Sequence, residues 1–216
     1  MRSNGRRSVK NRLDRFVSAL LLLLLAVNLT ACGQDGPSLQ ALPADAVVLA
    51  FGDSLTFGKG AKPGEAYPEI LAANISRRVI NAGLSGELSA DGLQRLPALL
   101  EQHRPALVVL CHGGNDILRK KPFSEPAANL REMIRLSRES GAQVVMLGVP
   151  RFGLFLSAAP FYQQIADEAE VPIDVEVLSD ILADNELKSD TVHPNAAGYA
   201  RLAQVIETLL RERGAL

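Results

Sequence analysis

The chain has 216 residues, of which 47% are hydrophobic and 22% charged, and its formal net charge is −1. This composition is ordinary for one globular domain with a sizeable core. Residues 1–31 carry six basic side chains and one acidic side chain, so the rest of the chain has a net charge of −6. An acidic domain without a basic stripe argues against nucleic acid as the partner.

The first 31 residues differ in composition from the rest of the chain. A basic leader precedes an apolar stretch over residues 16–27 that includes six consecutive leucines. This stretch of about twelve residues is shorter than the roughly 20 that span a bilayer, and its plan is that of a signal peptide. An N-terminal membrane helix that stays in place is the alternative.

The leader ends in Leu29-Thr-Ala-Cys32, which resembles the lipobox of bacterial lipoproteins. The resemblance implies that residues 1–31 are removed and that Cys32 is lipidated, which anchors an exported protein to the cell envelope. Gly33 after the cysteine favours the outer membrane. Arg6-Arg7 leaves twin-arginine export as an alternative, although the next three residues fit that pattern poorly. Residues 32–44 lack periodicity and are predicted to form a flexible tether.

From about residue 45, strand-like and helix-like segments alternate. Short apolar runs predict strands at 47–51, 79–80, 106–111, 143–149 and 173–175. Apolar residues at helical spacing predict helices around 67–75, 93–100, 127–134 and 199–210, the third of them capped by Ser124. This alternation predicts one three-layer α/β domain over residues 45–216 with a mostly parallel five-stranded sheet.

Polar residues follow the predicted strands at the points where the strands end. Ser54 follows the first strand, Gly83 the second and Asn115 the third. Asp190-Thr-Val-His193 lies beyond the fifth strand, just before the last helix. Open α/β sheets build their ligand sites at the carboxyl ends of the strands, so these residues are expected at one site.

The residue types at this edge suit ester hydrolysis by a serine nucleophile. A serine hydroxyl becomes a good nucleophile when a base such as His193 takes its proton. Asp190 can hold the imidazole in the required tautomer and stabilise its cation. The backbone N–H groups of Ser54 and Gly83 and the side-chain amide of Asn115 can then stabilise the oxyanion.

Four sequence blocks together resemble the SGNH (GDSL) hydrolase family. They are Gly52-Asp-Ser-Leu55, Asn81-Ala-Gly-Leu-Ser-Gly86, Gly113-Gly-Asn-Asp116 and Asp190-Thr-Val-His193. Gly64-Glu-Ala-Tyr-Pro68 is similar to the bacterial esterase, thioesterase and lysophospholipase branch. The resemblance implies a flavodoxin-like fold and metal-free hydrolysis through an acyl-serine, with Ser54, Asp190 and His193 as the triad. Gly83 and Asn115 would complete the oxyanion hole together with Ser54.

Other catalytic motifs do not fit the sequence. The α/β-hydrolase elbow Gly-x-Ser-x-Gly fails because Thr56 occupies its last place. The glycines at 58 and 60 have neither P-loop nor dinucleotide spacing, and no His/Cys cluster has zinc spacing. No cofactor and no metal are therefore expected. His112 departs from the family pattern, and it either tunes the pocket or is a satisfied structural histidine.

The apolar segment 150–162 follows the fourth strand at the same edge of the sheet. We expect Phe152, Leu154 and Phe155 to line an acyl pocket, the alternative being that this segment folds onto the core. The sequence as a whole predicts a lipid-anchored serine esterase acting on lysophospholipids or simple carboxylic esters. An O-acetyl polysaccharide deacetylase and a non-catalytic envelope-binding lipoprotein remain as alternatives.

Overall fold

The structure of the chain is a computed structural model that describes residues 36–151, 153 and 156–216. Several predictions on the sequence lie outside the described residues. These are the signal peptide, the lipidated Cys32 and the three pocket candidates Phe152, Leu154 and Phe155.

Five parallel strands form the central sheet, in the order β2-β1-β3-β4-β7. The strands are β1 (Val47–Gly52), β2 (Arg78–Gly83), β3 (Leu107–Cys111), β4 (Gln143–Leu147) and β7 (Ile173–Asp174). Every residue of β3 is buried, as expected for an apolar strand covered on both faces. In the register of the sheet, Gly52 at the end of β1 pairs with Gly83 on one side and Cys111 on the other. The predicted α/β fold with a parallel five-stranded sheet is thus confirmed.

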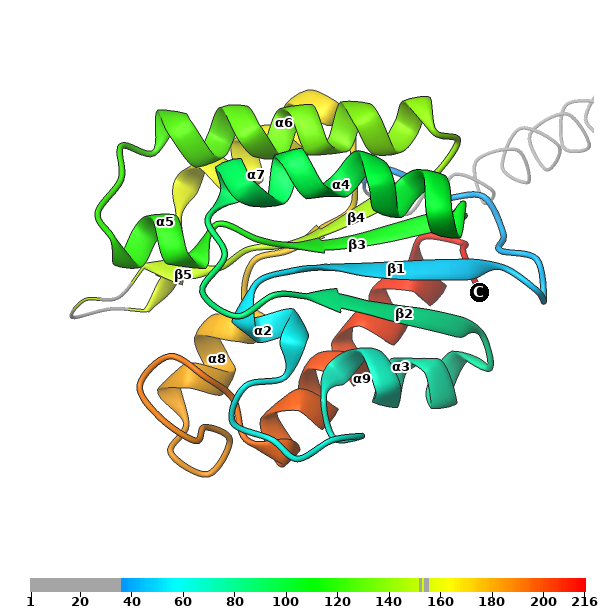
Figure 1. Cartoon of the computed structure of the whole chain (residues 1–216). Helices are drawn as coiled ribbons and strands as arrows, with labels where there is room; N and C mark the ends of the chain where they lie inside the picture. Colours follow the sequence, from blue (N-terminus) through cyan, green and yellow to red (C-terminus); the bar gives the residue numbers. More distant parts are fainter. Residues whose placement is uncertain (1–35, 152, 154–155) are drawn as a thin grey trace, which may run out of the picture. The chain divides into compact units, whose positions relative to one another are not determined.

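Helices cover both faces of the sheet and complete the three layers (Figure 1). One layer contains α4 (Ser89–His103), α6 (Ser124–Glu139) and α7 (Pro160–Ala169). The other contains α3 (Tyr67–Ile75), α8 (Val177–Ala183) and α9 (Ala196–Glu212). The apolar faces of these helices pack against the strands in one continuous core.

Short elements gather at the carboxyl edge of the sheet. Helix α2 (Ser54–Phe57) directly follows β1, and α5 (Gly114–Leu118) follows β3. The two-residue strands β5 (Pro150–Arg151) and β6 (Ser157–Ala158) form a separate antiparallel ribbon. Since parallel strands deliver their connections at this edge, the short elements surround the place where the candidate site was expected.

Two local predictions differ from the structure. Ser124 is the first residue of α6, with Phe123 at the N-cap position and no side-chain capping bond, so Ser124 does not cap this helix. The segment 39–42, assigned to the flexible tether, lies along the end of the chain. The N–H of Leu39 donates to the Arg213 carbonyl at 2.7 Å, and that of Leu42 to the Ala215 carbonyl at 2.8 Å. Leu42 is buried in the core, and this apolar contact explains why the packed chain begins before residue 45.

Within residues 36–151, 153 and 156–216, none of the helices has the length and apolar character needed to cross a membrane.

Candidate active site

Ser54 stands at a sharp turn between β1 and α2. Gly52 ends the strand where a methyl group would overlap the Cys111 carbonyl and the Thr56 hydroxyl, so the close approach requires glycine. Asp53 then caps α2 by accepting a hydrogen bond from the Leu55 N–H at 3.1 Å. This cap fixes Ser54 as the first residue of the helix, with its hydroxyl toward the carboxyl edge of the sheet.

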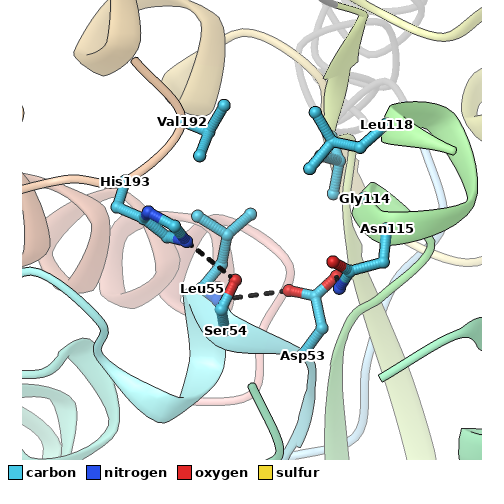
Figure 2. Close-up of a pocket in the computed structure, with 9 residues that line it drawn as sticks. Asp53, Ser54, Leu55, Gly114, Asn115, Leu118, Val192 and His193 are labelled. Atoms are coloured by element: carbon cyan, nitrogen blue, oxygen red, sulfur yellow. Dashed lines mark hydrogen bonds between the residues drawn. The ribbon is translucent and has the colours of Figure 1, made fainter. Parts of the chain in front are cut away.

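The Ser54 hydroxyl lies 3.0 Å from Nε2 of His193. Figure 2 marks this contact with a dashed line. Nδ1 of the same ring lies 2.8 Å from Oδ2 of Asp190 and 3.0 Å from Oδ1. A proton on Nδ1 is therefore shared with the carboxylate, and Nε2 is left as an acceptor toward the hydroxyl. This is the arrangement in which an imidazole can take a serine proton.

The turn before α9 holds His193 in place. The backbone N–H groups of Val192 and His193 donate to Oδ1 of Asp190 at 2.8 and 2.9 Å. Asn195 caps α9 through the Gly198 N–H, and its Nδ2 also donates to the Glu186 carbonyl at 2.8 Å. The carboxylate thus orients both the imidazole and the backbone that carries it.

The two carboxyl groups nearest the site have opposite shifts in pKa. Partial burial alone would raise the pKa of Asp190, but hydrogen bonds from His193 and from backbone N–H groups outweigh it and lower the pKa. Burial raises the pKa of Asp53, which is only 1% exposed, although the Leu55 N–H bond opposes the rise. Asp190 therefore carries its charge over a wider pH range than an ordinary aspartate.

Three groups at the same edge are candidates for an oxyanion hole. Gly83 lies under the end of α2, where a methyl group would overlap the Phe57 backbone, and its N–H donates to Asn81 Oδ1 at 3.0 Å. An oxyanion would have to compete with Asn81 for that N–H. The Ser54 N–H belongs to the first turn of α2, where N–H groups have no acceptor within the helix.

The third candidate, Asn115, is held from two sides. Its Nδ2 donates to the Glu87 carbonyl at 3.0 Å and to Asp53 Oδ2 at 3.3 Å. Figure 2 shows Asn115 and His193 on opposite sides of Ser54. A carbonyl group attacked by Ser54 would therefore have a base on one side and an amide donor on the other.

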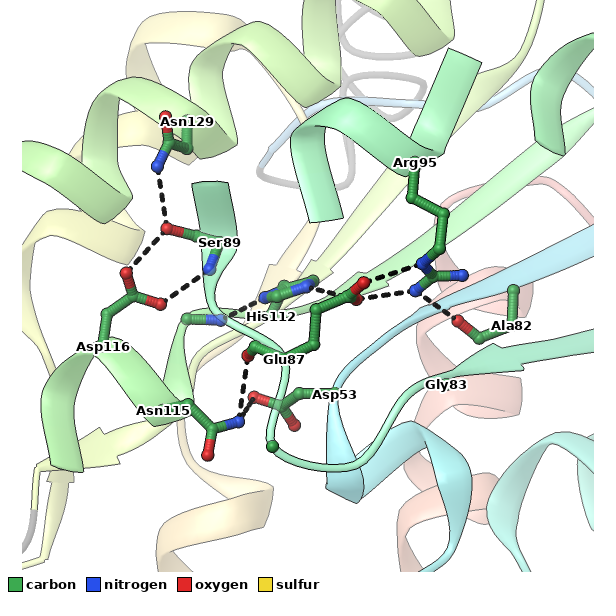
Figure 3. A network of polar contacts seen from close by, with 12 residues as sticks. Asp53, Ala82, Gly83, Glu87, Ser89, Arg95, His112, Asn115, Asp116 and Asn129 are labelled. Carbon is green, nitrogen blue, oxygen red and sulfur yellow. Dashed lines mark hydrogen bonds and ion pairs between the residues drawn. The ribbon is translucent and has the colours of Figure 1, made fainter. Parts of the chain in front are cut away.

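A buried polar network continues from Asn115 into the core (Figure 3). The Glu87 carboxylate accepts hydrogen bonds from Arg95 at 2.7 and 2.8 Å and lies 3.1 Å from His112 Nε2. Asp116 accepts hydrogen bonds from the backbone N–H and the hydroxyl of Ser89, both at 2.9 Å. His112 is thus a hydrogen-bonded, fully buried histidine outside the cavity lining.

The cavity over Ser54 has about 250 Å³ of empty space, part of which is open to solvent. The floor of the cavity is polar and its sides are apolar. Leu118 and Val192 lie on opposite sides of the cavity (Figure 2). The lining residues are Asp53, Ser54, Leu55, Gly114, Asn115, Leu118, Val149, Val192 and His193. Within the described ranges, no group of three or more His, Cys, Asp or Glu side chains is arranged to hold a metal ion.

The structure brings the predicted residues Ser54, Asp190, His193, Gly83 and Asn115 together at one edge. Sequence reasoning missed Glu87 and the apolar lining at Leu55, Leu118, Val149 and Val192. Val192 sits inside the Asp-Thr-Val-His block and Leu118 one helical turn after Asn115, so spacing from the motif residues could have indicated both.

Known proteins resemble this chain in sequence and in structure. Residues 50–201 match the GDSL-like lipase/acylhydrolase family. Esterase TesA of Pseudomonas aeruginosa is 33% identical over 177 residues, which cover 76% of this chain and 87% of that protein. Thioesterase 1/protease 1/lysophospholipase L1 of Escherichia coli K12 is 31% identical over 166 residues, 72% of this chain and 78% of that protein.

Solved esterase structures share the fold of this chain. The crystal structure of the psychrotrophic esterase EstA from Pseudoalteromonas sp., inhibited by monoethylphosphonate, matches with a TM-score of 0.69 at 25% identity. The match covers 78% of this chain and 98% of the EstA chain. Because the family match spans most of the chain and relatives above 30% identity cover more than two thirds of it, the chain belongs to the GDSL (SGNH) hydrolase family and is a carboxylic ester hydrolase.

Proposed function

We propose that the protein hydrolyses esters of the lysophospholipase, arylesterase or thioesterase type through an acyl-serine intermediate on Ser54. The observation that carries this proposal is the continuous chain of contacts from Ser54 through His193 to Asp190, at 3.0 and 2.8 Å. A nucleophile, a base and an orienting carboxylate within hydrogen-bond reach of one another are the requirements of this chemistry.

In the first half of the reaction, Ser54 Oγ attacks the carbonyl carbon while its proton passes to His193 Nε2. The carbonyl oxygen becomes an oxyanion, which the Ser54 N–H and Asn115 Nδ2 stabilise, together with the Gly83 N–H once it leaves Asn81. His193 then gives the proton to the departing alcohol or thiol, and the bond to the leaving group breaks.

The second half repeats these steps with water. His193 takes a proton from a water molecule, which attacks the acyl carbon and displaces Ser54 Oγ. The imidazole returns that proton to Oγ, and the carboxylic acid leaves. Asp190 stays ionised throughout and stabilises the imidazolium cation that forms twice in the cycle, which agrees with its lowered pKa.

The names of the relatives and the cavity walls support the proposed ester class. Relatives are named esterase and thioesterase/lysophospholipase, and the apolar sides at Leu118 and Val192 suit the hydrocarbon part of an acyl or aryl group. We propose that Phe152, Leu154 and Phe155 extend this apolar lining. The modest size of the cavity favours a second candidate, removal of acetyl groups from O-acetylated sugars.

The test is hydrolysis of p-nitrophenyl esters from acetate to palmitate, with lysophosphatidylcholine and an acetylated sugar alongside and Ser54→Ala as the control. Turnover that depends on Ser54 and rises with chain length supports the lipid esterase. Turnover confined to acetyl groups moves the substrate to acetylated sugars. A folded protein without turnover on any of these substrates contradicts the enzymatic proposal and favours an envelope-binding lipoprotein.

We further propose that the protein is exported and anchored to the cell envelope by lipid on Cys32, with the outer membrane as its place. The support is the lipobox-like Leu29-Thr-Ala-Cys32 after a short apolar stretch. Cys32→Ser should give unlipidated protein that is released from membranes and keeps its esterase activity. Membrane retention of that variant with the leader attached would contradict the proposal.

A further inference from the structure

Glu87 is a buried carboxylate at the edge of the candidate site. It lies in the loop between β2 and α4, and only 6% of its surface is exposed. Its side chain accepts hydrogen bonds from Nε and Nη2 of Arg95 and contacts His112 Nε2. Burial alone would raise the pKa of Glu87, but hydrogen bonds from His112 and Arg95 and the charge of Arg95 lower it to about 2.

The hydrogen bonds of His112 define its protonation. The Gly113 N–H donates to Nδ1 at 2.9 Å, so that nitrogen carries no proton. Nε2 therefore carries the proton of the neutral ring and donates it to Glu87 Oε2 at 3.1 Å. His112 is completely buried, and its place beside Glu87 follows from its position at the end of β3.

Arg95 anchors the carboxylate to the sheet. Its Nη2 donates to the Ala82 carbonyl at 3.0 Å, directly before Gly83, and its guanidinium lies 4.6 Å from the centre of the Phe51 ring. The Glu87 cluster, defined as Glu87, Arg95 and His112, thus joins the ends of β2 and β3 through one buried charge (Figure 3).

The backbone of Glu87 reaches the candidate oxyanion hole. Its carbonyl accepts the 3.0 Å bond from Asn115 Nδ2, while the second bond of that amide, to Asp53, is longer at 3.3 Å. An amide nitrogen has two N–H groups. The shorter bond holds one N–H group on the Glu87 carbonyl. The second N–H group, which now donates to Asp53, is therefore free to turn to a substrate oxyanion.

From this geometry we infer that Glu87 is a positioning residue for ester hydrolysis: its clamped carboxylate holds the backbone carbonyl that aims the Asn115 amide at the oxyanion. The inference rests on the proposed function of Ser54 and Asn115. It gives His112, at a position outside the family pattern, a role as a neutral donor to Glu87. Displacing a catalytic donor by about 1 Å can cost on the order of 10²-fold in rate.

The test is a double-mutant cycle with Asn115 on p-nitrophenyl butyrate. Glu87→Ala is expected to lower kcat about 10- to 100-fold with KM within about twofold, because the lost interaction acts in the transition state. Glu87→Gln, which retains the shape and the hydrogen-bonding ability, should recover much of the loss. In an Asn115→Ala background, Glu87→Ala should cost no further activity, since the residue acts through the amide.

A readout that needs no turnover separates this inference from the proposed function. The side-chain amide signals of Asn115, identified by their loss in Asn115→Ala, should shift in Glu87→Ala and in His112→Leu, and less in Glu87→Gln. They should stay unchanged in Glu168→Gln, a matched control in an exposed ion pair with Arg131. If Glu87→Ala does not fold, Glu87→Gln and His112→Leu replace it in the double-mutant cycle with Asn115→Ala.

Two results would overturn the inference. If the fold-losses in kcat of Glu87→Ala and Asn115→Ala multiply in the double variant, Glu87 acts independently of Asn115. Amide signals that do not move in Glu87→Ala or in His112→Leu would show that the carboxylate does not position the side chain. A wild-type protein without activity that depends on Ser54 would instead defeat the proposed function, while the amide signals still report on the positioning.

Discussion

Asn115 connects the turn that carries Ser54 with the loop after β2. Its amide touches Asp53, the neighbour of the proposed nucleophile, and the carbonyl of Glu87 in the loop after β2. Asn115 lines the cavity, whereas Glu87 and His112 behind it are buried. In the proposed mechanism, the oxyanion is therefore stabilised by a donor that is already oriented before substrate binds.

Replacing Asn115 with alanine should lower kcat by roughly 10²–10³, the usual cost of one oxyanion donor. The measurement is steady-state hydrolysis of p-nitrophenyl butyrate, with thermal unfolding followed by circular dichroism to show that the fold is intact. Gln164→Ala, which removes an exposed amide that bonds Glu168, serves as the control. A folded Asn115→Ala variant with full activity would remove this residue from the site.

Glu87 also makes the stability of the protein depend on pH. Its pKa in the folded state, about 2, lies below the ordinary value of 4.5, so its contribution is complete above pH 4.5 and is lost as the pH falls toward 2. Urea unfolding of wild type and Glu87→Gln should show a difference in free energy at pH 7 that shrinks at pH 3. A difference that stays constant between these pH values would contradict this assignment.

At the scale of elements, the segment 36–42 acts as a part of the domain. Leu39 and Leu42 are hydrogen-bonded to the last residues of the chain, and Gln40 exchanges two hydrogen bonds with Gln143 at the start of β4. Leu42 adds its buried side chain to the core. The segment thus covers the amino end of the sheet, opposite the candidate site.

A chain that begins at residue 44 should therefore be less stable than one that begins at residue 36. Burial of one leucine and two backbone hydrogen bonds together suggest a loss of about 2–4 kcal/mol in the free energy of unfolding. Urea unfolding of the two chains measures the difference, and Leu42→Ala in the longer chain should account for a large part of it. Equal free energies of unfolding for the two chains would mean that the contacts of residues 36–43 contribute nothing to stability.

The elements that could be predicted from sequence are those with a strong local pattern. The apolar runs of β1, β3 and β4 and the periodicity of α3, α6 and α9 identify these elements without knowledge of their neighbours. Helices α2 and α5 have four and five residues, too few for a period to show. They exist because the turns after β1 and β3 are held by tertiary contacts.

The same distinction applies to the site. Ser54, Asn115 and the Asp190–His193 pair belong to short sequence blocks that could be recognised before the structure was known. The contact of Glu87 with His112 joins residues 25 positions apart in different elements, and no local pattern indicates it. The bond from the Gly83 N–H to Asn81 likewise depends on a side-chain direction that spacing does not determine.

At the scale of the whole molecule, Gly36, where the described chain begins, and Ser54 lie at opposite ends of the sheet (Figure 1). Helix α9 runs from the turn of His193 to Arg213, and its 17 residues span about 26 Å (Figure 1). Gly36 lies against the Arg213 side chain, and the four residues from 32 to 35 can extend at most about 14 Å. If Cys32 is lipidated as proposed, the short distance from Cys32 to Gly36 leads us to predict that the site is directed away from the membrane.

Energy transfer to a fluorescent lipid headgroup can measure this orientation in vesicles that hold the lipidated protein. A donor dye on Asp45→Cys, at the amino end of β1, should transfer more strongly than one on Lys121→Cys, in the loop after α5. Both positions are exposed, and Cys111 is buried, so labelling is selective. A flexible insertion between residues 35 and 36 should reduce the difference. Equal transfer from both positions in the protein without the insertion would contradict this orientation.

The central claim is that the protein works through an ester on Ser54. The most direct measurement is the intact mass of protein quenched with acid during turnover of p-nitrophenyl acetate, followed by peptide mapping. The account predicts one acetyl group on the peptide that contains Ser54, and none in Ser54→Ala. Turnover by wild-type protein without an adduct, together with undiminished turnover by Ser54→Ala, would contradict it.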